Sequence, residues 1–120
     1  MTWLLVAAAG AAGATIRYSI GLAVGPRMFP WATLGINVSG SFALAVVVTL
    51  GTARLSQQTA TALAVGLIGA YTTFSTFAWE TTVLADTGRR ADALVYVVAS
   101  VLLSLLAAVA GRELGESLAG

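Results

Sequence analysis

The chain contains no cysteine, no histidine and no lysine, and only 9% of its 120 residues are charged. Without cysteine and histidine it cannot form a disulfide, a thiolate or imidazole metal site, or a Ser-His-Asp triad. Its net charge is +1 and its six arginines form no basic run, so nothing suggests a nucleic-acid surface. We therefore expect no enzyme and no nucleic-acid-binding protein.

What the chain has in abundance is apolar side chains. Hydrophobic residues make up 58% of it, and its mean hydropathy of +0.92 lies outside the range of soluble domains. Because a helix needs about 20 apolar residues to cross the bilayer, the chain has room for four spans and no soluble domain. The sequence therefore predicts an all-α membrane protein of four transmembrane helices, in one domain over residues 1–120.

Turn signals divide the chain into four spans. The first apolar run is interpreted as a retained span, not a signal peptide, because no basic residue precedes it and the run resumes after Arg17. Gly25, Pro26 and Arg27 then form a turn, and a second polar turn covers residues 86–90. The expected spans are approximately 3–24, 31–50, 59–84 and 93–110.

The third apolar stretch is too long for one straight span. Gly66 and Gly69 are followed by hydroxylated and β-branched residues, which compete with helical hydrogen bonds. We predict that this helix is broken near residues 70–73, in the middle of the membrane. Breaks of this kind are tolerated where they line a cavity or lie inside protein. An unbroken, tilted helix is the alternative.

The arginines give little orientation signal. Arg54 and Arg112 fall on the side of the termini, and Arg27, Arg89 and Arg90 on the other. Orientation follows the imbalance of basic residues, so a chain this evenly balanced is a candidate for inserting both ways. Two inverted copies could then pack as an antiparallel, dual-topology dimer. Counting Arg17 as well would tilt the balance.

Polar residues within the spans repeat at helical spacing. Three faces are predicted in this way: Thr33, Asn37 and Ser41 in the second span, Phe74, Phe77 and Glu80 in the third, and Tyr96, Ser100 and Ser104 in the fourth. Such residues can be purely structural, through bonds to their own helix or between helices. We expect the structural role for Thr15, Ser19, Ser39 and Thr49, and for the small-residue pair Gly21 and Gly25.

Taken together, the polar faces carry mostly hydrogen-bond donors. Donors without a full positive charge suit a small, strongly hydrated anion that must bind and also leave. The positive ring edges of Phe74 and Phe77 fit the same purpose, although two phenylalanines at this spacing are also ordinary core residues. Glu80 could lie near an interface, accept bonds from the hydroxyls or exchange protons. Arg17 could snorkel to the headgroups or line a vestibule.

Three blocks of this sequence resemble the Fluc/CrcB family of fluoride channels. They are residues 13–18, residues 33–42, and residues 69–77 with Glu80, where the Thr-Thr-Phe-Ser-Thr-Phe run is the most specific element. The resemblance implies an antiparallel homodimer with two pores, which passively exports cytoplasmic fluoride. The retained first span without a cleavable signal separately predicts the inner or plasma membrane of the cell. The resemblance further implies a structural sodium ion at the dimer centre, bound by the backbone carbonyls of Tyr71 and Thr72.

The resemblance also implies which side chains meet fluoride. Arg17 would belong to a vestibule, and the pore would be lined by Thr33, Asn37, Ser41, Thr73, Phe74, Thr76, Phe77, Glu80, Tyr96, Ser100 and Ser104. One departure is Ala70, where the family often has a second glycine. The assignment in the fourth span depends on offsets from Glu80 rather than on a dense motif.

Two other functions remain open from the sequence. A small proton-coupled exporter of the multidrug type also has four spans, but it would be expected to carry a carboxylate deep in its first span, and this chain has none there. A non-transporting membrane assembly protein would use the polar faces only for docking helices. The first would need a proton gradient for transport, and the second would transport nothing.

Overall fold

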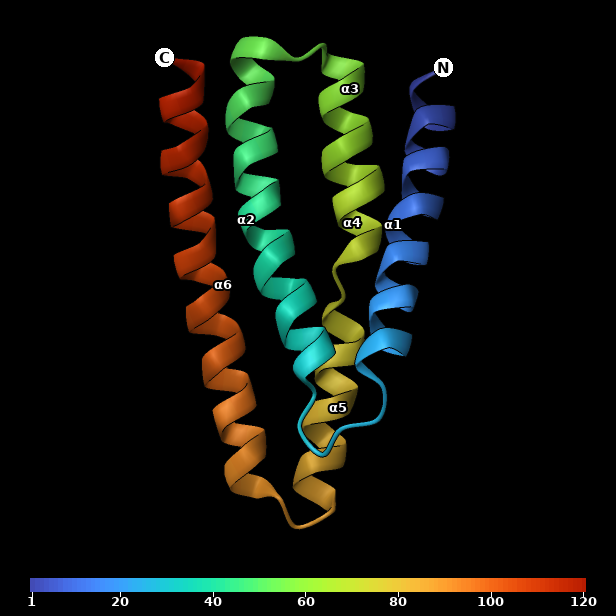
Figure 1. Ribbon diagram of the computed structural model, residues 1–120, viewed down its shortest axis with the longest axis vertical. Coiled ribbons are helices and arrows are strands. Elements are labelled where there is room, and N and C mark those ends of the chain that lie inside the picture. Colours follow the sequence, from blue (N-terminus) through green and yellow to red (C-terminus); the bar gives the residue numbers. More distant parts are fainter.

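The computed structural model describes residues 1–120 and contains only helices (Figure 1). Four segments are long and apolar enough to cross a membrane, which confirms the predicted all-helical class. The third of these segments comprises several consecutive elements, one of them the π-helix η1. The elements are α1 (Thr2–Val24), α2 (Trp31–Arg54), α3 (Gln57–Thr61), η1 (Ala62–Ile68), α4 (Gly69–Tyr71), α5 (Phe74–Asp86) and α6 (Arg90–Ala119).

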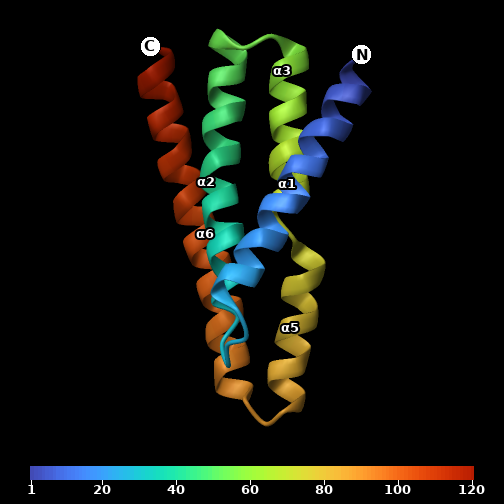
Figure 2. The same cartoon turned by 45° about the vertical axis from the view of Figure 1, so that its right-hand side comes forward.

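The helices form an elongated bundle of 48 × 29 × 20 Å. Helix α2 packs along α6, while α1 packs on η1 and α4 and crosses that segment obliquely (Figure 2). The two termini lie at one end of the bundle, and the connection between α1 and α2 lies at the other end (Figure 1). This arrangement brings the central part of α2 next to the end of α4.

Few side chains are buried inside the subunit. Only 14 of 120 residues are buried, and large apolar side chains are exposed along α1, α2 and α6. Such a surface requires lipid or another apolar partner around it. The main internal cluster forms where α2, α5 and α6 meet, and it consists of Leu34, Leu84, Ala93 and Tyr96. Tyr96 is the only large side chain that is completely buried.

The third membrane segment is interrupted by two residues of extended backbone. Helix α4 ends at Tyr71, Thr72 has ψ 160°, and Thr73 has φ −153° and ψ 114°. Helix α5 begins at Phe74, and the Thr73 hydroxyl caps it by accepting a 3.2 Å hydrogen bond from the Thr76 amide. The extended residues lie within the region 70–73 that the sequence singled out.

Two helices continue beyond the expected spans. Helix α2 runs through Gly51 to Arg54, because Gly51 packs closely against Ala60 of α3 instead of ending the helix. Helix α6 continues to Ala119, since Arg112 and Glu116 form an ion pair of 2.7 Å one turn apart. The residues expected to form a short tail are therefore helical.

Candidate functional site

Asn37 of α2 holds the extended backbone at Thr73 in place. Its Nδ2 donates to the carbonyl of Thr73 at 3.0 Å, and its Oδ1 accepts from the amide of Thr73 at 2.9 Å. Both polar groups of a residue outside the helices are thereby satisfied, as a bilayer interior requires. An amide nitrogen carries two hydrogens, so one donor of Asn37 remains for another acceptor.

A cavity of about 440 Å³ lies next to this clamp. No charged residue lines it. Helices α2, α5 and α6 bring seven of the predicted pore residues to its wall, namely Asn37, Ser41, Thr73, Phe74, Phe77, Ser100 and Ser104. Two residues from each of the three predicted faces thus meet at one cavity, which we call the donor cavity, while Thr33, Glu80 and Tyr96 do not line it.

Ser100 is the most informative residue of the donor cavity. Its side chain is 7% exposed, and its hydroxyl is the only buried side-chain polar atom without a hydrogen-bond partner. A buried hydroxyl without a partner carries a desolvation penalty that folded proteins normally avoid. Ser100 therefore lines the donor cavity with a hydroxyl that is itself buried and whose donor is unused. The hydroxyl of Ser41, by contrast, donates at 2.7 Å to the Asn37 carbonyl of its own helix.

The two predicted pore phenylalanines lie together but differ in environment. The ring centroids of Phe74 and Phe77 are 5.5 Å apart, at a tilt of 53°. Phe77 continues the contact to Tyr96, at 5.1 Å between centroids. Phe74, however, is 79% exposed, so its ring projects from the subunit.

Glu80 of α5 accepts hydrogen bonds from two other predicted pore residues. Thr33 of α2 donates to Oε1 at 2.9 Å, and Tyr96 of α6 donates to Oε2 at 2.7 Å. No arginine forms an ion pair with this carboxylate. The three side chains therefore form a polar cluster across α2, α5 and α6, which we call the Glu80 cluster.

A second cavity, of about 620 Å³, touches the Glu80 cluster from the end of the bundle opposite the termini. We call it the outer cavity. Its wall includes five predicted residues, namely Arg17, Thr33, Thr73, Thr76 and Glu80. Thr73, which caps α5, lines both cavities. Arg17 donates from Nε to the Ala70 carbonyl at 3.2 Å, so it reaches toward the interrupted helix and does not snorkel along α1.

Tyr71 and Thr72, the predicted sodium ligands, lie where α4 ends. The carbonyls in the last turn of a helix lack helical partners, and the helix dipole makes them negative. The hydroxyl of Tyr71 is 2.8 Å from that of Ser39, and the Thr72 hydroxyl donates to the Ile68 carbonyl. The backbone oxygens therefore remain the groups suited to a hard cation, and no acidic cluster competes with them.

Most residues expected to be structural are structural. The hydroxyls of Thr15, Ser19 and Thr49 donate to carbonyls one turn earlier in their own helices, at 2.7 to 2.8 Å. Ser39 also bonds its own helix, through the carbonyl of Ile36, but its hydroxyl in addition contacts Tyr71. Ser39 thus connects α2 to the end of α4.

No sequence pattern indicated two residues near the site, Phe29 and Arg89. Phe29 packs edge-on against Tyr96, with centroids 5.5 Å apart and an interplanar angle of 77°. Arg89 donates to the carbonyl of Met28 and pairs with Asp92. Both contacts involve connections between helices, where no periodicity indicates which side chain points inward.

Comparison with known proteins gives consistent matches over nearly the whole chain. The family profile described as CrcB-like protein, Camphor Resistance (CrcB) matches residues 4–112. A Nitrobacter winogradskyi protein named fluoride-specific ion channel FluC is 42% identical over 95% of this chain and 97% of its own length. Proteins of that name from Paracoccus denitrificans and Saccharophagus degradans are 40% and 44% identical, over 98% and 97% of this chain and 96% and 90% of their own.

Proposed function

The chain belongs to the CrcB family, and from this membership we propose that it is a fluoride-selective channel that conducts passively out of the cell. It is a multi-pass protein of the cell membrane and not an enzyme. Its curated relatives are named fluoride-specific ion channels and match it over nearly their full length. The chain's own polar residues support the same substrate.

The observation that carries the proposal is the free hydroxyl of Ser100 at the wall of an uncharged donor cavity. Fluoride is small and strongly hydrated, so a pore must replace its water with donors at short range. Ser100, Ser104 and the second N–H of Asn37 supply such donors. Because no arginine lines this cavity, the ion is not trapped by a full charge and leaves again.

Fluoride moves, in this proposal, between the donor cavity and the outer cavity past Thr73 and Thr76. The ring edges of Phe74 and Phe77 provide weakly positive surface on the first side. The Glu80 cluster lies on the second side, where Thr33 and Tyr96 screen the carboxylate with two hydrogen bonds. Arg17 at the outer cavity raises the local anion concentration.

We further propose that two inverted copies form the active dimer, with two pores. The apolar surface of α2 and α6 and the 79% exposed ring of Phe74 support this, because both need an apolar cover. In the dimer, Phe74 would complete the wall of the donor cavity with groups from the second copy. The nearly balanced arginines support insertion in both orientations.

A sodium ion at the centre of the dimer completes the proposal. The carbonyl oxygens of Tyr71 and Thr72 would hold it, and its charge would offset the negative end of the α3–α4 segment. The role of the ion would be structural only, because it would fix the ends of two interrupted helices against each other. No conduction step involves it.

The test is fluoride efflux from liposomes that contain the purified protein, measured with a fluoride electrode at fixed pH, with chloride as the comparison ion. We expect rapid fluoride release, little chloride release and no requirement for a proton gradient. Release that depends on a proton gradient would favour a proton-coupled exporter, for which Glu80 is the candidate carboxylate. A folded, incorporated protein that releases no fluoride would favour an assembly role.

A further inference from the structure

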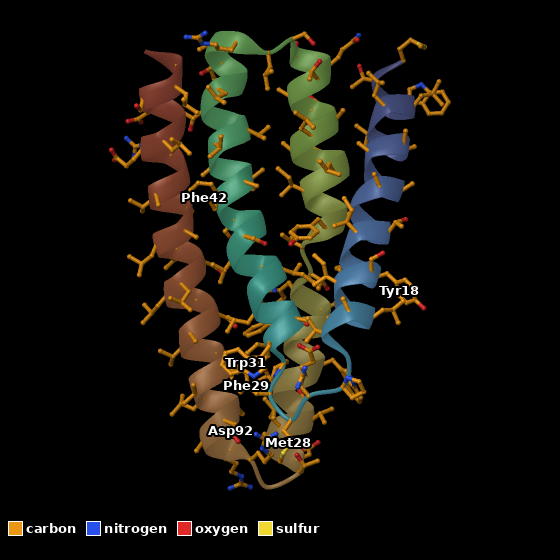
Figure 3. All side chains as sticks on the ribbon, in the orientation of Figure 1. Tyr18, Met28, Phe29, Trp31, Phe42 and Asp92 are labelled. Atoms are coloured by element: carbon orange, nitrogen blue, oxygen red, sulfur yellow. The ribbon has the colours of Figure 1, made fainter.

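The loop of residues 25–30, here called the strap, joins α1 to α2 at the end of the bundle opposite the termini. In the view of Figure 3, Met28, Phe29 and Trp31 lie at the same end of the bundle as Asp92 of α6. Met28, Phe29 and Pro30 of the strap line the outer cavity together with Thr33 and Glu80, so the strap borders the Glu80 cluster. Its position therefore bears on that cluster.

Arg89 anchors the strap to the turn before α6. Its Nη1 donates to the backbone carbonyl of Met28, and its guanidinium is fixed by Asp92 at 2.7 Å. The side chain of Met28 is 78% exposed, so the anchor uses only the main chain there. Arg90, the next residue, makes no side-chain hydrogen bond and no ion pair, although it has the same charge.

Phe29 transmits the position of the strap to the interior. Its ring packs edge-on against Tyr96 at 5.5 Å and also contacts Trp31 at 4.6 Å. Tyr96 has no exposed surface, and its phenol donates to Glu80 at 2.7 Å. Hydrogen bonds weaken steeply when their angle is lost, so a phenol ring that is free to tilt would release Glu80.

We infer that Phe29 is a positioning residue for fluoride conduction: held by the Arg89 anchor, it keeps the phenol of Tyr96 on Glu80. The inference rests on the proposed fluoride channel. Phe29 lines the outer cavity but has no hydrogen-bond donor to offer an anion, so its effect on Glu80 passes through the Tyr96 ring. Without it, Glu80 keeps only the hydrogen bond from Thr33 at a cavity wall, and the carboxylate becomes free to repel the permeating anion.

Two readouts on the full-length protein test this inference. The first is fluoride efflux from liposomes. The second is the NMR signal of the Tyr96 Cζ in protein with ¹³C-labelled tyrosine, which reports the hydrogen bond of the phenol. The chain has only three tyrosines, and the spectrum of Tyr96→Phe identifies the signal.

We expect Phe29→Ala to lower fluoride efflux about fivefold and to shift the Tyr96 signal, because the hydrogen bond from Tyr96 to Glu80 is weakened but not removed. Arg89→Gln should do the same to a smaller extent and leaves the interior packing intact. Arg90→Gln removes a neighbouring charge that makes no hydrogen bond and no ion pair, so it should match the wild type. Phe29→Leu keeps apolar volume and replaces Phe29→Ala if that variant gives no folded protein.

The possible results test the role of Phe29 separately from the proposed channel function. Reduced efflux with an unshifted Tyr96 signal would show that Phe29 acts only on general stability and would overturn the inference. A folded Phe29→Leu or Phe29→Ala variant that shows a shifted Tyr96 signal but wild-type efflux would also overturn the inference. In both cases the channel itself stands. A folded wild-type protein that conducts no fluoride would instead overturn the proposed function and the inference with it.

Discussion

Ser100 has the one buried hydroxyl that lacks a hydrogen-bond partner, and it lies where three polar helix faces meet. Its effects on stability and on conduction should therefore have opposite signs. In a purely structural site, removal of the hydroxyl would relieve a desolvation penalty and do nothing else. In a fluoride pore, the same change also removes a donor that the ion needs after it has shed water.

We predict that Ser100→Ala raises the free energy of unfolding by about 1 kcal/mol and lowers fluoride efflux about tenfold. Thermal unfolding in detergent and liposome efflux measure the two effects. Ser19→Ala is the matched control, since the Ser19 hydroxyl bonds only its own helix at 2.8 Å. An increase in stability without loss of efflux would remove Ser100 from the pore.

Individual residues also show what could and could not be predicted from the sequence. The spacing of Thr33, Asn37 and Ser41 was enough to put them on one face, since a helix fixes which side chains share a side. It could not show that Asn37 would bond both backbone groups of Thr73, because the two residues are 36 positions apart. Nor could it indicate Phe29, which lies in a loop without periodicity.

At the scale of elements, the extended residues between α4 and α5 depend on a helix cap. Thr73 caps α5 in the same way as Ser56 caps α3. Each hydroxyl accepts a 3.2 Å hydrogen bond from the backbone amide three residues later. Loss of such a cap costs about 1 kcal/mol. Only Thr73, however, lines the cavities.

We therefore predict that Thr73→Ala and Ser56→Ala each lower the free energy of unfolding by about 1 kcal/mol, while only Thr73→Ala reduces fluoride efflux. Thr73→Ser keeps the capping oxygen and should restore efflux. Denaturation curves and liposome efflux on the same preparations give both quantities. If Ser56→Ala impaired efflux as strongly as Thr73→Ala, general stability would explain both losses.

The glycines show which helix contacts the sequence could not assign. Gly21 and Gly25 were expected to allow close packing, but within the subunit nothing lies within 4 Å of a side chain placed at either residue. Close approaches occur instead at other glycines, among them Gly111, where a Cβ would collide with the carbonyl of Phe42 in α2. A glycine's neighbours are set by how two helices cross, and neither helix carries that information alone.

We predict that Gly111→Ala forces α6 away from α2 and lowers the free energy of unfolding by about 2 kcal/mol. Gly21→Ala, on an open face of α1, should instead be stabilising by up to about 1 kcal/mol, because alanine loses less backbone entropy in a helix. Unfolding monitored by helical circular dichroism tests both. Equal effects of the two substitutions would contradict the packing of α6 on α2.

For the whole molecule, composition and length were sufficient to predict four helices long and apolar enough to cross a membrane. Apolar runs set the number of spans because the bilayer has a fixed thickness. The helix ends were harder, since α6 continues to Ala119 through polar residues that form an ion pair along its surface. Polarity predicts where a helix leaves the apolar layer, and not where it stops being helical.

The orientation of the whole molecule in the membrane gives the last prediction. If copies insert both ways, any single site should be found on both sides of the membrane. The chain has no native cysteine, so one introduced cysteine gives an unambiguous label. Gln58 and Asp86 are exposed residues at opposite ends of the third membrane segment.

For both Gln58→Cys and Asp86→Cys, an impermeant thiol reagent should modify about half of the protein in intact cells and the remainder only after permeabilisation. A protein with one orientation would give complete labelling at one site and none at the other. That result would exclude an antiparallel dimer of identical chains, and the exposed ring of Phe74 would then need a cover other than an inverted copy. Half-labelling at both sites would leave the balanced arginines as the physical cause of dual insertion, and adding one lysine beside Arg54 should shift the proportion toward one side.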